Sequence, residues 1–393
     1  MASPEHVPTL GLDTMRRLDR WLGLPLCWLA AIALRLARRV RRRPRQAPPG
    51  RVLYVALAEM GSIVLAAPAI RAQTARLGSK PLFVTLAPTR PVFDFLGANF
   101  AAEVHVLRTD SLLTLAADLG FFAWSVRRSG VAVAIDLDPG ARFSALLTLL
   151  AGAPRRAGFA GPDHPYRGDF FTHTVNCPVE RHMNANFAAL ITAPFAAPFD
   201  ATVGTTASVV RLRPHSQQRL ILIHANLSDP VPQRRWPRDH YLALCRALLA
   251  AGPEWQLLFI GGAAEAPVAA QLCAELDDAR CRSVAGDYAI TELPRLFAGA
   301  AVLVSSDSGP AHFAAHAGLP VVALFGPETP QRYGPQGTAT TLYAALPCSP
   351  CLSAHRQRAS ACTDARCMAM IGVDAVLDAV RAHLAPAQQA ARA

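Results

Sequence analysis

Residues 305–312 bring together side chains that suit the binding of a negatively charged ligand. Asp307, Ser308 and His312 lie within this short stretch, and Gly309 and a proline sit among them. An apolar run at 300–304 precedes them and a short helical pattern at 311–317 follows, so they occupy a turn between a strand and a helix. The first turn of a helix offers unpaired N–H groups and a partial positive charge. We therefore predict that this turn binds a phosphate or a carboxylate.

Polar residues also follow two other predicted strands in the second half of the chain. Arg234 and Arg235 lie in the loop after an apolar run at 220–224, and Glu265 follows the run at 255–260. A guanidinium group matches the paired oxygens of a diphosphate. A carboxylate just beyond a strand can accept both hydroxyls of a ribose. Each residue alone could be a helix cap or a solvated loop residue, but their number favours a ligand site.

A third group of candidates lies in the first half of the chain. Glu59 and Ser62 stand in the turn between an apolar strand pattern at 51–57 and a helix predicted at 63–77. Asp136 and Asp138 end another strand pattern at 131–137, where either could face a ligand or cap the next helix. A carboxylate at such a place can remove a proton from a hydroxyl, whereas an unaided serine cannot.

The elements that position these residues alternate between strand and helix along the whole chain. Further strand patterns occur at 82–86, 104–107 and 321–325, and helices are predicted at 91–96, 111–128, 141–150 and 371–384. Buried strands joined by helices indicate parallel sheets, and ligands then bind beyond the carboxyl ends of the strands. The sequence therefore predicts an α/β protein with two doubly wound domains. It contains neither G-x-G-x-x-G nor a P-loop, which weakens dehydrogenase and ATPase hypotheses.

The central stretch resembles a known family. Residues 307–312 read DSGPAH and residues 320–327 read PVVALFGP, which looks like the signature of the family 9 glycosyltransferases, the heptosyltransferases of lipopolysaccharide core assembly. The resemblance extends over roughly residues 51–375. It implies two Rossmann-like domains that face a cleft in the GT-B arrangement. The acceptor would bind the first domain and the sugar nucleotide, ADP-heptose by resemblance, the second. Transfer would invert the anomeric centre without a metal or a cofactor.

The resemblance also assigns roles to the candidate residues. It implies that the donor contacts residues of four loops in the second domain, namely Asn226, Arg234, Arg235, Glu265, Asp307, Ser308, Gly309 and His312. The family aspartate that is thought to deprotonate the acceptor is Ser62 here, so we predict that Glu59 is the base. Two alternatives remain open. The chain could be a transferase for another sugar nucleotide or envelope glycan, or a membrane-bound sugar-nucleotide-binding protein that lost its base.

The first 49 residues form a tail distinct from the two predicted domains, which span 50–205 and 216–385. Residues 21–34 are an apolar run interrupted by Pro25, which is shorter than the roughly 20 residues that a spanning helix needs. Seven arginines follow between positions 35 and 45. We predict that residues 21–45 bind the inner face of the cytoplasmic membrane, next to a lipid-linked saccharide acceptor. A spanning helix, or a helix docked on the protein itself, is the alternative.

Charge and cysteine usage narrow the protein class further. The formal charge is +11, but ten of the arginines lie in residues 1–50, so the domains are only mildly basic and nucleic acid is not an expected partner. Most of the nine cysteines are scattered in apolar segments, as expected for reduced thiols in the cytoplasm. The last four lie close together in the sequence and could bind zinc, stay reduced or form a disulfide: Cys348, Cys351, Cys362 and Cys367. The loop at 158–169 offers three acceptor-side candidates: His164, Tyr166 and Arg167.

Overall fold

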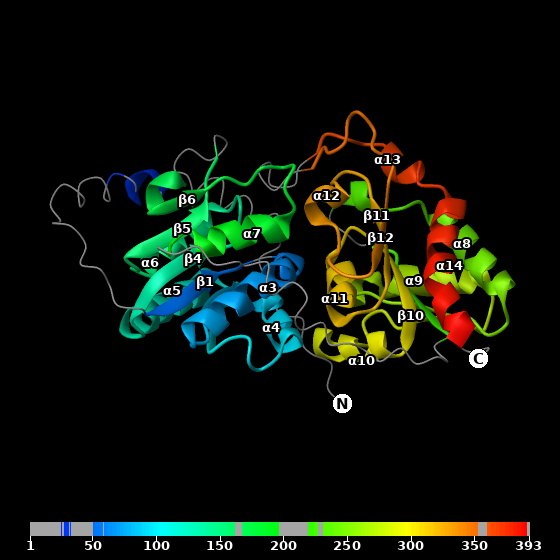
Figure 1. Ribbon diagram of the computed structural model, residues 1–393, viewed down its shortest axis with the longest axis horizontal. Helices are drawn as coiled ribbons and strands as arrows, with labels where there is room; N and C mark the ends of the chain where they lie inside the picture. Colours follow the sequence, from blue (N-terminus) through cyan, green and yellow to red (C-terminus); the bar gives the residue numbers. More distant parts are fainter. Residues whose placement is uncertain are drawn as a thin grey trace. The chain divides into compact units, whose positions relative to one another are not determined.

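The computed structural model describes residues 25, 27–30, 32, 50–57, 59–161, 167–195, 219–226, 231–352 and 360–390. The chain divides into two compact units (Figure 1). The first unit comprises Met1–Pro178 and Asn184–Thr205, and the second comprises Val179–Met183 and Thr206–Ala393. Each unit is built around one parallel six-stranded sheet.

The sheet of the first unit has the strand order β3-β2-β1-β4-β5-β6. Its strands are β1 (Arg51–Val55), β2 (Leu82–Leu86), β3 (Glu103–Leu107), β4 (Val131–Asp136), β5 (Arg155–Phe159) and β6 (His173–Val175). All neighbouring strands run parallel. The central strands β1, β2 and β4 are almost entirely buried, as expected when helices cover both faces of a parallel sheet.

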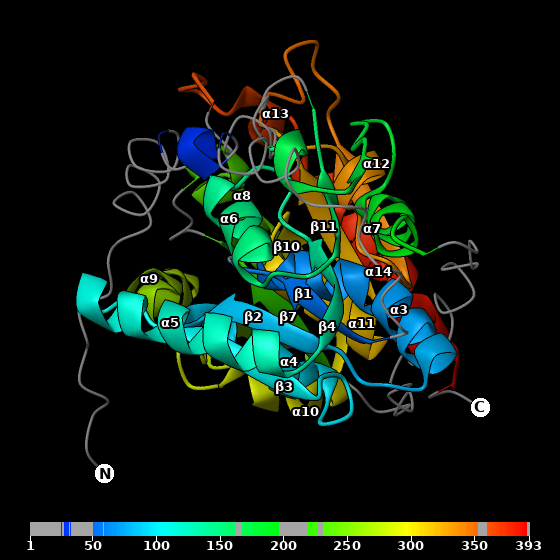
Figure 2. The same ribbon diagram turned by 90° about the vertical axis from the view of Figure 1, so that its left-hand side faces the viewer.

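Two sets of helices cover this sheet. They are α3 (Met60–Leu77), α4 (Pro91–Leu96), α5 (Leu112–Arg128), α6 (Arg142–Leu150) and α7 (Met183–Thr192), with short 3-10 turns η1 (Ala87–Thr89) and η2 (Gly168–Phe170). On one face, α5 and α6 share a core with the strands through Phe122 and Leu147 (Figure 2). Residues 27–30 belong to a helical segment beside α6, where Cys27 packs on Ala145 and Phe170.

The second unit repeats the design with the strand order β12-β11-β10-β7-β8-β9. Its strands are β7 (Leu220–His224), β8 (Gln256–Phe259), β9 (Cys281–Ser283), β10 (Ala300–Ser306), β11 (Val321–Phe325) and β12 (Ala339–Tyr343). Its helices are α8 (Arg238–Ala251), α9 (Ala266–Leu276), α10 (Leu293–Ala298), α11 (Gly309–Ala317), α12 (Pro330–Tyr333), α13 (Arg366–Ala369) and α14 (Val373–Ala390). Three 3-10 turns complete it: η3 (Pro232–Arg234), η4 (Ala263–Glu265) and η5 (Ile290–Glu292).

A five-residue segment from the middle of the chain belongs to the second unit. Val179–Met183 is assigned to that unit, although the residues on both sides of it belong to the first. The imidazole Nε2 of His182 donates a hydrogen bond of 2.9 Å to the carbonyl oxygen of Gly334. This bond ties the segment to the loop after α12.

The predicted strand, turn and helix around residue 307 are confirmed. The strand β10 leads into α11, which ends at Gly318, and Gly318 has the left-handed φ of 88° that favours glycine. The strand β11 then occupies the predicted residues. The predicted α/β class with two doubly wound, Rossmann-like domains is confirmed as well.

The start of α3 differs from the prediction. The helix begins at Met60 rather than at residue 63, because the N–H of Ile63 already bonds the carbonyl oxygen of Glu59 at 3.2 Å. Ser62 therefore lies in the first helical turn, and Glu59 is the N-cap residue. Along the described residues, no helix combines the length and the apolar character that crossing a membrane requires.

Candidate active site

The sheet register of the second unit brings together residues from three strand ends. His224 is the last residue of β7 and is paired with Ser305 of β10. Its Nδ1 lies 3.2 Å from the hydroxyl of Ser305 and 3.1 Å from that of Ser308. Its Nε2 lies 3.2 Å from Oε2 of Glu265, which follows β8. The imidazole thus connects the predicted anion site to the predicted ribose site.

The carboxylate of Glu265 is held in place from two sides. Its Oε2 accepts a hydrogen bond of 3.0 Å from the backbone N–H of Gly262, the N-cap residue of η4, and Glu265 is the third residue of that turn. The same oxygen faces His224. A carboxylate with two fixed contacts is positioned before a ligand arrives, which lowers the entropy cost of binding.

Ser308 is at the N-cap position of α11, but its side chain does not cap the helix. Its hydroxyl contacts His224 and, at 3.0 Å, the hydroxyl of Ser305. Ser308 therefore does not act as a side-chain cap of α11. The reason is the imidazole of His224, which competes for the serine hydroxyl from the neighbouring strand. The capping hydroxyl is thus absent from the first turn of α11, where Gly309 is the first helical residue.

Arg234 and Asp307 form a buried ion pair at this edge of the sheet. Arg234 Nε lies 3.6 Å from Asp307 Oδ2, and both side chains are 8% exposed. Arg234 ends η3, and the loop continues to Trp236, whose indole N–H bonds the carbonyl oxygen of Ile371 at 2.9 Å. Trp236 has a structural role, since its ring is almost fully buried. Its anchoring fixes where Arg234 stands.

Three further predicted donor residues lie on the same elements. His312 is buried in α11, one helical turn after Ser308. Asn226 follows β7, is buried, and has a positive φ of 54°, a conformation that asparagine tolerates better than most residues. Arg235 is half-buried after η3. These residues share the carboxyl end of the sheet with Arg234 and Glu265.

Gly326 directly follows β11 and lies against α13. A Cβ atom at this position would lie 2.5 Å from Sδ of Met368 and 2.8 Å from Sγ of Cys367. The missing side chain therefore makes room for α13. Helix packing, rather than ligand access, requires glycine here.

The first unit places Glu59 and Ser62 in direct contact. The hydroxyl of Ser62 donates a hydrogen bond of 2.7 Å to Oε2 of Glu59. Both residues are half-buried at the start of α3, directly after β1. The Glu59 carboxylate therefore lies next to the Ser62 hydroxyl and does not extend into solvent.

Two carboxyl groups lie next to this pair, of which Asp136 is fully buried and Asp138 half-buried. Asp138 accepts the backbone N–H of Leu57 at 3.1 Å, and its own N–H bonds Oδ1 of Asp136 at 3.0 Å. Burial, followed by the charge of Asp136, raises the pKa of Asp138 to about 8, and the charge of Glu59 contributes to the same shift. Burial also raises the pKa of Asp136 to about 6, against the opposing charge of Arg167. Asp138 is thus mainly neutral at pH 7.

Arg167 is a structural residue of this cluster rather than an acceptor ligand. Its guanidinium is almost fully buried and contacts Asp136 at 2.8 Å. It also donates to the carbonyl oxygens of Phe159, Ala141 and Asp138. The other two acceptor-side candidates, His164 and Tyr166, lie outside the described residues.

The sequence reasoning missed His224 and did not recognise the pairing of Asp136 with Arg167. The signal for His224 was its place at the end of an apolar run, opposite a strand that ends in serines. The partner of Asp136 is 31 positions away in a turn-rich loop. Neither partner is indicated by local spacing.

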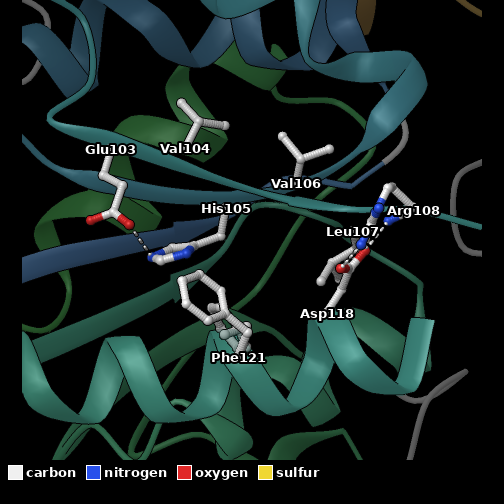
Figure 3. Close-up of a pocket in the computed structure, with 9 residues that line it drawn as sticks. Glu103, Val104, His105, Val106, Leu107, Arg108, Asp118 and Phe121 are labelled. Carbon is white, nitrogen blue, oxygen red and sulfur yellow. Dashed lines mark hydrogen bonds and ion pairs between the residues drawn. The ribbon is translucent and has the colours of Figure 1, made fainter. Parts of the chain in front are cut away.

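A pocket of about 320 Å³ lies elsewhere in the first unit, between β3 and α5 (Figure 3). Its lining includes His105 and Phe121, and none of the predicted site residues. All nine cysteines are free thiols. Within the described ranges, no group of three or more His, Cys, Asp or Glu side chains is arranged to hold a metal ion.

Comparison with known proteins identifies the family. The model described as glycosyltransferase family 9 (heptosyltransferase) matches residues 122–361. Lipopolysaccharide heptosyltransferase 2 of Escherichia coli K12 is 34% identical over 102 residues, which make up 25% of this chain and 29% of that protein. The matched segment therefore spans less than a third of that relative.

Two solved structures share the fold over most of their length. The structure of E. coli ADP-heptose LPS heptosyltransferase II covers 86% of this chain and 99% of its own, with a TM-score of 0.64 and 20% identity. E. coli heptosyltransferase WaaC with ADP covers 85% of this chain and 99% of its own, with a TM-score of 0.63 and 19% identity. The family model matches more than half of the sequence, and the chain therefore belongs to glycosyltransferase family 9, the heptosyltransferase family.

Proposed function

We propose that this protein transfers a heptose from ADP-heptose to a hydroxyl of a lipid-linked lipopolysaccharide-core acceptor, with inversion and without a metal ion. The observation that carries the proposal is the cluster at the carboxyl ends of β7, β8 and β10. There, Arg234 pairs with Asp307, and His224 connects Ser308 to Glu265. These are the groups that a nucleoside diphosphate sugar needs, on a family 9 fold.

In this proposal the donor extends across the strand ends of the second unit. The Glu265 carboxylate accepts the ribose hydroxyls, and its contact with His224 holds it in place. Arg234 and Arg235 bind the diphosphate, and His312 lies beside it. Asp307 accepts hydroxyls of the transferred sugar, which would exchange part of its contact with Arg234 for the ligand. ADP is proposed because the similar E. coli structures are an ADP-heptose heptosyltransferase and a heptosyltransferase with bound ADP.

The chemical step has one bond forming and one bond breaking. The acceptor oxygen attacks the anomeric carbon while the bond from that carbon to the diphosphate oxygen breaks, and the electron pair leaves with ADP. The acceptor proton passes to Glu59, the carboxylate that Ser62 contacts at 2.7 Å. Because Asp138 is mainly neutral at pH 7, it does not add a second negative charge beside Glu59.

Negative charge grows on the leaving diphosphate during this step. Arg234 and Arg235 and the first turn of α11 would stabilise it, since preorganised positive groups gain strength at a site that excludes water. Buried Arg234 is held by the anchored loop around Trp236, which limits the reorganisation that the reaction would need.

The acceptor and the membrane complete the proposal. A lipid-linked saccharide at the inner face of the cytoplasmic membrane would meet an enzyme held there by residues 21–45. Most of that segment lies outside the described residues. In the described part, Cys27 is buried against α6 and η2, whereas Trp28 and Leu29 are more than half exposed. In these few residues one side packs on the protein and the other is exposed, which is compatible with both the membrane contact and the docked helix.

The test measures ADP release from ADP-heptose with a lipopolysaccharide-core acceptor, in the presence of a chelator. We compare the wild type with Glu59→Gln and with Glu180→Gln, an exposed control. We expect Glu59→Gln to lower kcat by about a hundredfold or more, the usual contribution of a general base. ADP affinity, measured by calorimetry, should be unchanged in both variants.

Two other results would contradict the proposal. Full turnover of Glu59→Gln would remove Glu59 from the reaction. Nucleotide binding by a wild type that turns over no donor in a panel of sugar nucleotides would indicate a binding protein instead.

A further inference from the structure

The outer side of α5 is apolar where a surface helix is normally polar. Six positions on one side of the helix, over three turns, are exposed and carry no charge or hydrogen-bonding group except the indole N–H. These positions form the outer stripe of α5: Leu113, Ala116, Ala117, Gly120, Phe121 and Trp124. One of them, Phe121, lies at the edge of this side and also lines the pocket toward β3 (Figure 3). The opposite side of the helix is buried through Phe122 and Val126. The helix is therefore firmly packed, and the stripe is not a result of loose folding.

Large exposed apolar residues gather on this face of the first unit. Among the described residues, nine large apolar side chains are exposed, and four of these lie on α5 and two on residues 28–29. Helices α5 and α6 cover the same face of the sheet, and the segment of residues 27–30 packs beside α6 (Figure 2). Single exposed apolar residues need no explanation, whereas four of these side chains are grouped on one helix.

Two arginines lie at the C-terminal end of the outer stripe. Arg127 and Arg128 are exposed in the last turn of α5, and the guanidinium of Arg128 lies 5.1 Å from the ring centre of Trp124. No acidic side chain in the described part of the chain forms an ion pair with either of them. Arg108, which follows β3, is instead paired with Asp118 in the middle of α5 at 2.7 Å (Figure 3). The stripe thus combines Trp, Phe and Leu with two available positive charges.

The size of the stripe argues against a second copy of the chain as its partner. Residues 113–124 span about 17 Å of helix, and a helix side is about 10 Å wide, so the stripe offers roughly 170 Å². A stable protein interface needs about 800 Å² from each partner. A lipid surface needs no minimum area of this kind, because a single helix can insert its apolar side into the bilayer surface and be surrounded there by lipid.

We propose that the outer stripe of α5 inserts into the surface of an anionic phospholipid bilayer, with Arg127 and Arg128 on the lipid phosphates. Tryptophan with adjacent arginine is typical of side chains at the boundary between lipid and water. This contact is separate from the one proposed for residues 21–45. It goes beyond the proposed glycosyl transfer and stands without it, since binding needs neither donor nor acceptor.

The tryptophans of the chain permit a direct test. Trp236 and Trp255 are buried in the second unit, so replacing Trp21 and Trp28 with phenylalanine leaves Trp124 as the only exposed tryptophan. The full-length protein with these replacements is mixed with vesicles of phosphatidylglycerol and phosphatidylethanolamine whose acyl chains carry bromine. We expect the bromine to quench the Trp124 fluorescence, and phosphatidylcholine vesicles to quench it far less.

Variants of the stripe test the same contact by vesicle flotation. Replacing Phe121 and Trp124 with serine should weaken binding to anionic vesicles by about tenfold, as should replacing Arg127 and Arg128 with glutamine. Tyr288→Ser with Met370→Ser, which removes two exposed apolar groups of the second unit, is the matched control and should bind normally. Circular dichroism melting confirms that each variant is folded.

Three results would overturn the inference. The first is vesicle binding without quenching of Trp124, which would leave residues 21–45 as the whole contact. The second is equal flotation of the stripe variants and the control. The third is a dimer in sedimentation equilibrium that the Phe121 and Trp124 replacements dissociate, which would assign the stripe to a second copy.

Discussion

Replacing Asp138 with asparagine should change how the stability of the first unit depends on pH. The carboxyl group of Asp138 has a pKa of about 8 in the folded protein, against 3.8 for an unperturbed aspartate. Between these values the folded state holds a proton that the unfolded state has released. The free energy of unfolding therefore falls as pH rises from about 4 to about 8, by at most about 1.4 kcal/mol per pH unit. Asparagine has no such proton, so this loss is absent in the variant.

The magnitude follows from the width of that pH range. Three pH units, from pH 5 to pH 8, correspond to at most about 4 kcal/mol. Asp136 and Asp138 interact, so part of the proton uptake belongs to Asp136 and persists in the variant. We therefore expect the difference in the free energy of unfolding to change by about 2 kcal/mol. The free energy of unfolding of Asp138→Asn, minus that of the wild type, should rise by this amount across the range. The amide oxygen of asparagine can still accept the N–H of Leu57, so the change leaves the local hydrogen bond intact.

The assay is urea unfolding followed by circular dichroism at several pH values. The two units can unfold in separate transitions, so the free energy is taken from the unfolding transition whose midpoint the replacement shifts. Asp110→Asn, an exposed residue just before α5, is the matched control and should show no dependence of its difference on pH. A constant difference for Asp138→Asn would mean that Asp138 is ionised in the folded protein, and the reasoning about the carboxyl cluster would be refuted.

Three other replacements test separate contacts. Arg167→Met should destabilise the first unit by about 3–5 kcal/mol, because it leaves the Asp136 carboxylate buried without its positively charged partner. Thermal melting measures this loss, and an unchanged melting temperature would contradict it. Gly326→Ala should lower the free energy of unfolding by about 1–3 kcal/mol, because the new methyl group meets Met368. In urea unfolding, adding Met368→Ala should restore part of this loss, and no recovery would rule out the contact as its cause. His224→Ala should weaken ADP binding about tenfold in calorimetry, because the imidazole no longer holds the carboxylate of Glu265 and the hydroxyl of Ser308 in place. Unchanged affinity would exclude the proposed arrangement of ribose and phosphate groups.

The sequence allowed the central strands and the turn at residue 307 to be predicted, because both depend on local patterns. Five-residue apolar runs such as β11 are fully buried, and a glycine with positive φ ends α11 where the pattern indicated. Strands β5, β6, β9 and β12 were not predicted. None of them is fully buried, and β6 and β9 have only three residues each, so their pairing depends on the neighbouring strand and leaves no periodic signal.

Several site features also depend on distant contacts. His224 meets Ser308 only because β7 lies beside β10, 84 positions later in the chain. The requirement for glycine at residue 326 comes from Met368 of α13. Local spacing carries neither contact, whereas the position of Glu59 beside Ser62 follows from one helical turn and could be anticipated.

The assignment of Val179–Met183 bears on how family members can be recombined. A hybrid enzyme made with one crossover at residue 205 would combine the segment of one parent with the second unit of the other. Its His182 would then face a foreign loop in place of the Gly334 carbonyl group that it bonds in this chain. A clean exchange of the second unit needs two inserted pieces, residues 179–183 and the chain from residue 206 onward.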